Sequence, residues 1–389
     1  MSRPNLRASM SHRLTVDAQR VPPSSPAAIF GRRRRGLTAQ AAAMPSAQAA
    51  VGAALATLLL LVAARRATVR LRARLGVTLI TFPLWPGRPH PCMKVFLPAG
   101  VRANGGTERE RLGLGALPAL VVFRGGGWET CLSSGGGTAE WAAEVAGLVG
   151  VEVEYAAKIG GHPLRGPRLP EGSVLGELPD GESPYPQCLR DAARAVRLLR
   201  SLASDGQLPI DPKRVCACGF SAGGWLAAML ASTQAEPLTA PTDELSADFR
   251  CTPDRVACCY AVTSLINADD PPRMLESYDL LLGPLTSDTQ LRERLSPAKQ
   301  LSSSTPPLFV WHTVEDPLVP SSHSLELYAA ARAHGVAAEL HLYAGDGATT
   351  GRHAQGLATN NPGLAGWSAQ MLAWLGEEWR PPDAPRVSR

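Results

Sequence analysis

The chain has 389 residues, a length that suits one large α/β domain with an additional terminal segment. Its 39 Lys and Arg residues against 34 Asp and Glu residues give a formal net charge of +5. Residues 1–75 hold 13 Arg against a single acidic residue, so the rest of the chain is mildly acidic. We therefore expect no nucleic-acid partner, although residues 32–35 form an Arg tetrad.

The first part of the chain differs in composition from the rest. Residues 1–46 are rich in Arg, Ser, Pro and Ala, which predicts a disordered or targeting segment. In the hydrophobic segment 47–66, the uncharged run from Ala49 to Ala64 has 16 residues, and extension back to Met44 gives 21. About 20 residues span a bilayer. We expect a single-pass membrane anchor. A targeting peptide cleaved on the way to the secretory pathway or an organelle lumen, and a buried helix, remain as alternatives.

Residues 76–380 are expected to form one large α/β domain, followed by a tail at 381–389. Strand-like and helix-like segments alternate here, which predicts a mostly parallel sheet with helices on both faces. Two antiparallel edge strands are expected at 77–84 and 92–98, and further strands at 118–123, 150–155, 214–219, 255–263, 307–313 and 339–343. Helices are expected at 138–148, 187–204, 223–232, 323–334 and 364–378.

Two stretches resemble insertions. Residues 158–186 are rich in Gly and Pro, and residues 265–301 combine acidic, proline and leucine residues with one or two expected short helices. Both would emerge near the mouth of a site at the carboxyl ends of the strands. Each is interpreted as a lid or a wall of an acyl pocket, with a passive surface loop as the alternative.

The most informative motif is G-x-S-x-G at Gly219–Gly223, with Ser221 at its centre. An apolar, strand-like run precedes it and a helix-like run follows it. A serine at the apex of a strand–turn–helix is a nucleophile elbow, and the small residues around it permit the tight turn.

A serine nucleophile needs a base and an orienting carboxylate, which in this kind of fold follow it in the order Asp or Glu, then His. Asp316 comes directly after the strand at 307–313, and His353 follows the strand at 339–343 and a glycine-rich loop. We predict Ser221 as nucleophile, Asp316 as acid and His353 as base. Glu315 is the main alternative to Asp316, and a solvated loop histidine is the alternative reading of His353.

The negative oxygen that forms during acyl transfer needs backbone N–H donors. One would come from Ala222, the residue after the nucleophile, and the others from Gly125, Gly126 and Gly127, which follow the strand at 118–123. A plain glycine-rich turn is the alternative. The glycine runs match neither a phosphate-binding loop nor a dinucleotide fingerprint.

The eight cysteines include no C-x-x-C pair, and no His, Cys and carboxylate residues show metal-ligand spacing. We therefore predict no metal and no organic cofactor. Disulfide bridges could in principle form among Cys92, Cys131, Cys188 and Cys251. The sequence therefore does not indicate whether the protein resides in an oxidising or a reducing compartment.

Several segments resemble α/β-hydrolases of the acetyl-xylan esterase and bifunctional acetyl/feruloyl esterase type, with an elbow and an oxyanion loop like those of the hormone-sensitive lipases. The resemblance runs from about Val77 to Leu375 and is carried by Gly125–Trp128, by Asp211–Val215 leading into Gly219–Gly224, and by Asp316–Pro320. It implies the α/β-hydrolase fold and the same Ser, Asp and His roles.

The sequence departs from this family at three places. A Glu-Gly pair is replaced by Ser134-Gly135, an Arg by Ala156, and Ala354 follows His353 where the family has Gly. Because of these departures, the resemblance does not establish the substrate.

We expect a serine esterase acting on a short-acyl, acetyl-type ester of a small molecule or carbohydrate. Alternatives are an isoprenylcysteine methylesterase, an aminoacylpeptidase-like enzyme, and a non-catalytic binding protein with a hydrolase fold. The oligomeric state is not predicted.

Overall fold

The computed structural model describes residues 76–103, 115–158, 183–344 and 352–381. The predicted segments 1–46 and 47–66, almost all of the tail and most of the predicted insertion at 158–186 lie outside these residues. No helix within the described ranges is both long and apolar enough to cross a bilayer.

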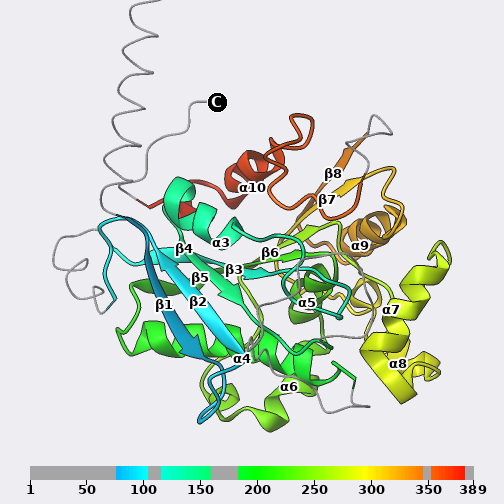
Figure 1. The fold of residues 1–389 in the computed structure, drawn as a ribbon, viewed down its shortest axis with the longest axis horizontal. Helices are drawn as coiled ribbons and strands as arrows, with labels where there is room; N and C mark the ends of the chain where they lie inside the picture. The colour runs from blue at the N-terminus through cyan, green and yellow to red at the C-terminus, as the bar shows by residue number, and fades with distance from the viewer. Residues whose placement is uncertain (1–75, 104–114, 159–182, 345–351, 382–389) are drawn as a thin grey trace, which may run out of the picture. The chain divides into compact units, whose positions relative to one another are not determined.

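The described residues are built on one eight-stranded sheet in the order β1-β2-β4-β3-β5-β6-β7-β8 (Figure 1). The strands are β1 (Thr78–Pro83), β2 (Cys92–Leu97), β3 (Leu117–Phe123), β4 (Val149–Val153), β5 (Ile210–Phe220), β6 (Arg255–Cys259), β7 (Leu308–Thr313) and β8 (Ala338–Tyr343). β2 pairs antiparallel with β1 and β4, and all other neighbours are parallel. The predicted mostly parallel sheet with an antiparallel edge is confirmed.

One predicted strand was too long. The pattern at 255–263 predicted a strand of nine residues, but β6 ends at Cys259. The next residue, Tyr260, has a φ of 38°, which is incompatible with extended backbone, so the chain turns out of the sheet there.

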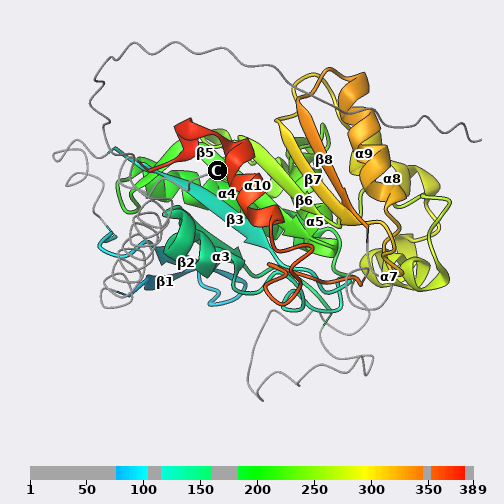
Figure 2. The same cartoon turned by 90° about the horizontal axis from the view of Figure 1, so that it is seen from above.

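Helices cover both faces of the sheet, as predicted. They are α3 (Thr138–Trp141), which continues as a π-helical turn (Ala142–Ala146), α4 (Gln187–Ser204), α5 (Ala222–Leu230), α6 (Ala235–Thr239), α7 (Pro272–Leu282), α8 (Thr289–Arg294), α9 (Ser322–Ala333) and α10 (Trp367–Leu375). Short 3-10 turns lie at Ala240–Thr242, Glu244–Ala247, Gly283–Leu285, Pro297–Lys299 and Glu377–Trp379. In Figure 2, α3 and α10 lie in front of the sheet, and α4 and α5 lie behind it.

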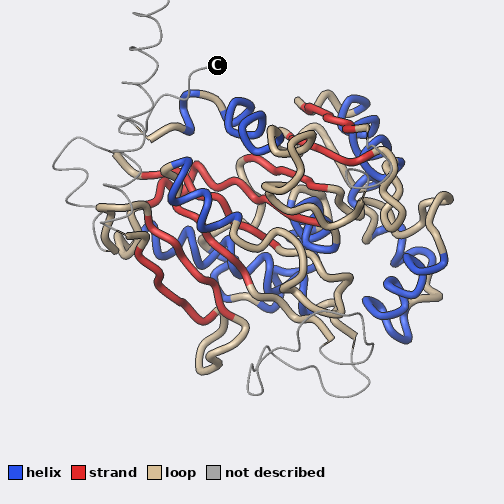
Figure 3. Tube along the Cα trace, turned by 45° about the horizontal axis from the view of Figure 1, so that its top comes forward, coloured by secondary structure: helices blue, strands red, loops and turns tan. Residues whose placement is uncertain are grey.

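The central strands β3, β6 and β7 are apolar almost throughout because both of their faces are buried. Val121 and Phe123 of β3 belong to a core that includes side chains of α4, α5 and α9. Leu120 and Val122 alternate with them and belong to a second core with α3 and α10. Side chains of a strand point alternately to opposite faces, so an unbroken apolar run fills both cores. Figure 3 shows the strands as a layer between helices.

The predicted insertion at 265–301 contains the two short helices α7 and α8, beside the sheet in Figure 1. Buried hydrogen bonds hold α7 in place. The Tyr278 hydroxyl lies 2.7 Å from Asp270 Oδ2, and His323 Nε2 of α9 lies 2.8 Å from Asp270 Oδ1. The insertion is therefore fixed to the body of the domain.

Candidate active site

Ser221 lies at the junction between β5 and α5, as the G-x-S-x-G pattern predicted. Its φ of 55° and ψ of −121° are rare for a side-chain-bearing residue, and its N–H donates to Cys259 O over 3.0 Å. A Cβ on Gly223 would lie 2.2 Å from Phe123 O, so only glycine permits α5 to approach β3 this closely. The turn places the serine at the carboxyl edge of the sheet.

The structure brings Ser221, His353 and Asp316 together from three separate loops. His353 Nε2 lies 2.8 Å from Ser221 Oγ, and His353 Nδ1 lies 2.6 Å from Asp316 Oδ2. The carboxylate only accepts, so Nδ1 carries the proton and Nε2 is free to accept from the serine hydroxyl. This arrangement can withdraw the serine proton. The carboxylate at His353 Nδ1 belongs to Asp316, the predicted acid.

The tight turn after β7 holds the Asp316 carboxylate in place. Its Oδ1 accepts from the N–H groups of Leu318 and Val319 over 2.9 and 3.0 Å. Burial would raise the pKa of this carboxyl, but the hydrogen bonds with His312 and His353 lower the pKa well below its ordinary value. Asp316 is therefore ionised at neutral pH and can stabilise a positively charged His353.

His312 is a supporting residue that sequence analysis did not assign to the site. It is fully buried in β7; its Nδ1 lies 2.7 Å from Ser324 Oγ, and its Nε2 lies 2.9 Å from Val319 O and 3.5 Å from Asp316 Oδ2. Burial lowers its pKa despite the nearby carboxylate. The available signal was a histidine inside an apolar strand, four residues before the predicted acid.

Two aromatic side chains fix the loop that carries His353. The Tyr260 ring packs edge-on against the imidazole, with 5.0 Å between ring centroids. Gly356 N donates to the Tyr260 hydroxyl over 2.8 Å, and Trp367 Nε1 donates to Gly356 O over 3.1 Å. No motif marked these residues, because their role arises from contacts between distant parts of the chain.

The predicted oxyanion donors need one correction. Gly125 N–H donates to Ser134 O over 3.0 Å, so it is engaged within the protein. A Cβ on Gly125 would lie 3.0 Å from Ser221 Cβ and 2.8 Å from Phe220 O, so this glycine provides clearance beside the serine. Ala222 is the first residue of α5, where an N–H has no acceptor within the helix. Ala222, Gly126 and Gly127 remain the candidate donors.

The run after the glycine loop also supports the site. Ser133 N donates to Gly125 O over 2.9 Å, while Ser134 O accepts from Gly125 N. This reciprocal backbone pairing holds Gly125 against the Ser133–Ser134 segment, and the same run enters α3 through Gly137 at a φ of 78°. Sequence analysis gave Ser133 and Ser134 no role in the site.

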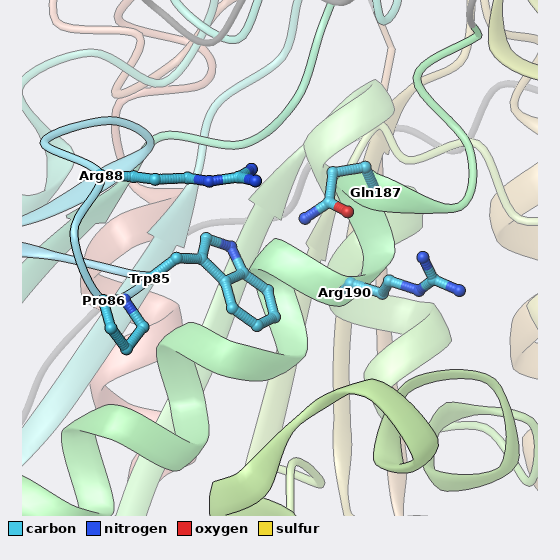
Figure 4. A pocket seen from close by; sticks show the side chains of 5 residues that line it. All are labelled: Trp85, Pro86, Arg88, Gln187 and Arg190. Carbon is cyan, nitrogen blue, oxygen red and sulfur yellow. The ribbon is translucent and has the colours of Figure 1, made fainter.

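A pocket of about 280 Å³ opens beside the start of α4 and is lined by Trp85, Pro86, Arg88, Gln187 and Arg190 (Figure 4). Trp85 Nε1 and Gln187 Nε2 each donate to Asp191 Oδ1 over 2.7 Å. Asp191 is buried, which raises its pKa to about 6. None of the lining residues belongs to the predicted catalytic set.

All eight cysteines lie within the described residues, and each carries a free, buried thiol. The bridges left open among Cys92, Cys131, Cys188 and Cys251 are therefore not formed. Burial raises the pKa of the Cys92 and Cys251 thiols to about 12 and that of Cys131 to about 11. These thiols are protonated at neutral pH.

Comparison with known proteins places this geometry in context. The family model described as BD-FAE matches residues 179–331, which include Ser221 and Asp316. The chain is 30% identical over 182 residues to the esterase LipQ of Mycobacterium tuberculosis, and 35% identical over 143 residues to endo-1,4-beta-xylanase B of Butyrivibrio fibrisolvens. These matches cover 45% and 36% of this chain, and 42% and 21% of the relatives. The chain thus matches less than half the length of either.

A solved structure matches over a larger share. It is the acetyl ester-xyloside bifunctional hydrolase from Caldicellulosiruptor lactoaceticus, with a TM-score of 0.56 and 27% identity. The match covers 76% of this chain and 94% of that one. The recurrence of esterases among these matches supports the prediction of a carboxylic ester hydrolase. The sheet, the elbow and these comparisons show that the chain has the α/β-hydrolase fold and is similar in sequence to proteins that include esterases.

Proposed function

We propose that this protein is a serine esterase that hydrolyses carboxylic esters through an acyl-enzyme intermediate. The observation that carries the proposal is the hydrogen-bonded series from Ser221 Oγ through His353 to Asp316 Oδ2, with distances of 2.8 and 2.6 Å. It lies at the carboxyl ends of parallel strands, where this class of sheet binds ligands.

In the first half of the reaction, Ser221 Oγ attacks the ester carbonyl while His353 Nε2 takes the serine proton. The tetrahedral intermediate collapses, the ester C–O bond breaks, and His353 returns the proton to the leaving alcohol. In the second half, His353 takes a proton from water, which attacks the acyl-enzyme, and the acid is released with Ser221 restored. Asp316 holds the imidazole and stabilises its charged form throughout.

The negative oxygen of each intermediate would be stabilised by the N–H of Ala222 and by those of Gly126 and Gly127. The loss of one such donor typically lowers the rate about 10²–10³-fold. The helix that begins at Ala222 adds the positive end of its dipole at the same position.

We further propose a short acyl group, such as acetyl. Large rings pack around the glycine loop: the Trp128 ring centroid lies 5.6 Å from that of Trp225 and 6.3 Å from that of Tyr278, and all three side chains are buried. A Cβ on Gly127 would lie 3.8 Å from Ser277 Oγ of α7. This proximity of α7 to the glycine loop is consistent with the predicted role of the 265–301 insertion as a pocket wall.

The test compares hydrolysis of p-nitrophenyl acetate, butyrate and octanoate by the wild-type protein and by Ser221→Ala. We expect kcat/KM to fall at least about 10³-fold in the variant, because the nucleophile is lost. Ser303→Ala, at an exposed serine, serves as the matched control. A preference for acetate would support the short acyl pocket, and a preference for octanoate would contradict it.

Equal turnover by wild type and Ser221→Ala would overturn the esterase proposal. Activity only on amide substrates would instead favour an aminoacylpeptidase-like enzyme, and cleavage only of prenylated methyl esters would favour a methylesterase. A failure of Ser221 to react with a fluorophosphonate probe would favour the non-catalytic binding protein.

We also propose that residues 47–66 attach the protein to a membrane. The support is the uncharged run within this segment, which is close to the length of a bilayer span. Delivery to the secretory pathway or to an organelle lumen after cleavage of a targeting peptide is the alternative location.

A further inference from the structure

Three side chains of the kinds that bind transition metals meet on the antiparallel side of the sheet. Cys92 is the first residue of β2, His90 lies two residues before it, and Glu154 directly follows β4. Met93 pairs with Val153, and Glu154 N donates to Cys92 O over 2.9 Å. The strand register therefore fixes Cys92 beside Glu154, with both backbones held by the sheet.

The possible ligand atoms already converge. His90 Nδ1 lies 2.8 Å from Glu154 Oε2, Cys92 Sγ lies 3.1 Å from the same oxygen, and all three atoms are within 4.8 Å of one another. Metal–ligand bonds of about 2.0–2.3 Å in a tetrahedral site place ligand atoms roughly 3.3–3.8 Å apart. The hydrogen-bonded ligand atoms would therefore have to move apart by about half an ångström for a metal ion to replace the protons between them.

Burial and access also suit a metal ion. Cys92 is 1% exposed, whereas the side chains of His90 and Glu154 are 37% and 5% exposed. The two inner ligands are rigid and shielded, and the outer ligand lies toward solvent. An ion could enter past His90, and a water molecule could occupy the fourth position.

The remaining oxygen of Glu154 is already engaged. Lys94 Nζ lies 3.0 Å from Oε1, which leaves Oε2 directed at His90 and Cys92. A hydrogen bond to the second oxygen of a ligating carboxylate is the usual way in which such a ligand is oriented. Lys94 thereby acts as a positioning residue, at the cost of one positive charge near the ion.

We propose that His90, Cys92 and Glu154 bind a divalent transition metal ion of the zinc class, with water as the fourth ligand. Nitrogen, sulfur and oxygen ligands together suit Zn²⁺ and Co²⁺ better than Mg²⁺ or Ca²⁺. On binding, the Cys92 S–H bond breaks, a proton leaves to solvent, and a metal–sulfur bond forms.

The site would be structural and not catalytic. Tyr155 follows Glu154 directly, and its hydroxyl donates over 2.5 Å to the carbonyl of Arg124, which precedes the glycine loop. A metal at Glu154 would therefore stabilise the strand end that supports this loop. Sequence analysis found no metal site because Glu154 is 62 residues from Cys92.

The test is titration of the purified, metal-free, full-length chain with Co²⁺, followed by absorption. We expect one Co²⁺ per chain, a thiolate-to-cobalt charge-transfer band, and displacement of the cobalt by Zn²⁺ with a rise in Tm. Cys92→Ser should abolish the band, and the half-exposed His90→Ala should weaken Co²⁺ binding by at least roughly tenfold.

The matched control is His341→Ala, since His341 Nε2 lies 3.3 Å from Glu339 Oε2 in a histidine–carboxylate pair whose imidazole is 26% exposed, against 37% for His90. This variant should bind Co²⁺ as the wild type does. The proposal would be overturned by the absence of the band in the wild type, by its persistence in Cys92→Ser, or by unchanged binding in folded His90→Ala. These readouts do not depend on ester hydrolysis, so the metal site and the esterase proposal fail separately.

Discussion

At the scale of single residues, His312 shows how the buried side of the site is held together. Val319 O only accepts, so Nε2 of His312 carries the proton, and Nδ1 accepts from the Ser324 hydroxyl. The neutral ring thus has a partner at each nitrogen. A second proton, on Nδ1, would be buried and would have to displace the proton of the Ser324 hydroxyl from this position. The Asp316 carboxylate, 3.5 Å from Nε2, would favour the charged ring.

This environment predicts a pH dependence of stability. Burial lowers the pKa of His312 below its ordinary value of 6.5, so below pH 6.5 the unfolded chain binds this proton and the folded chain resists it. The free energy of unfolding therefore decreases as the pH is lowered below 6.5. This residue contributes at most about 1.4 kcal/mol per pH unit. Denaturant unfolding between pH 7.5 and 5 should show this slope in the wild type and a flatter one in His312→Asn.

The same slope in both proteins would contradict the assignment to His312.

Asp316 also makes the protein less stable as the pH is lowered, but in a more acidic pH range. Its lowered pKa makes its contribution complete above the ordinary value of 3.8 and lost as the pH falls further. The two groups can therefore be separated by the pH range of the measurement.

Tyr260→Phe tests the anchor of the His353 loop. Removal of the hydroxyl leaves the N–H of Gly356 without its acceptor, which typically costs about 1–3 kcal/mol for a buried group. We expect a lower free energy of unfolding and a reduced kcat on p-nitrophenyl acetate with little change in KM, because the base is less well positioned. Tyr343→Phe is the control, since its hydroxyl contacts the exposed Gln370 at the surface. A kcat equal to that of wild type would show that Tyr260 is not needed to position His353.

At the scale of secondary-structure elements, the approach of α5 to β3 leaves no room for a side chain at the contact. A Cβ on Gly223 would meet Phe123 O at 2.2 Å and Arg124 O at 2.4 Å. Both neighbours are backbone atoms, so neither can rotate away. The helix or the start of the glycine loop would have to move.

Gly223→Ala is therefore expected to lower the free energy of unfolding by at least about 2 kcal/mol and to reduce esterase activity together with stability. Gly366→Ala is the matched control: a Cβ there meets nothing within 4 Å, and its φ is −75°. The control should change stability by less than about 0.5 kcal/mol. Equal stability of the two variants in urea unfolding would show that α5 is not packed this closely.

At the scale of the whole molecule, the hydrophobic segment 47–66 predicts where the protein resides. Cells producing the full-length chain should retain the protein in the membrane fraction after a high-salt wash, because the burial of an apolar segment in lipid is insensitive to salt. A variant lacking residues 47–66 should appear in the supernatant with an unchanged kcat/KM. Full-length protein in the supernatant, with its N-terminus intact, would contradict the membrane anchor.

The sequence by itself determined the order of strands and helices, because apolar runs buried on both faces and glycine-bounded turns are local signals. The positions of Ser221, Asp316 and His353, each after the end of a strand, followed from the same alternation. Only the tertiary structure decided that Gly125 bonds to Ser134, that Tyr260 and Trp367 hold the His353 loop, and that Glu154 lies beside Cys92. These contacts join residues that are far apart in the chain, or depend on which way a loop turns, so no local pattern encodes them.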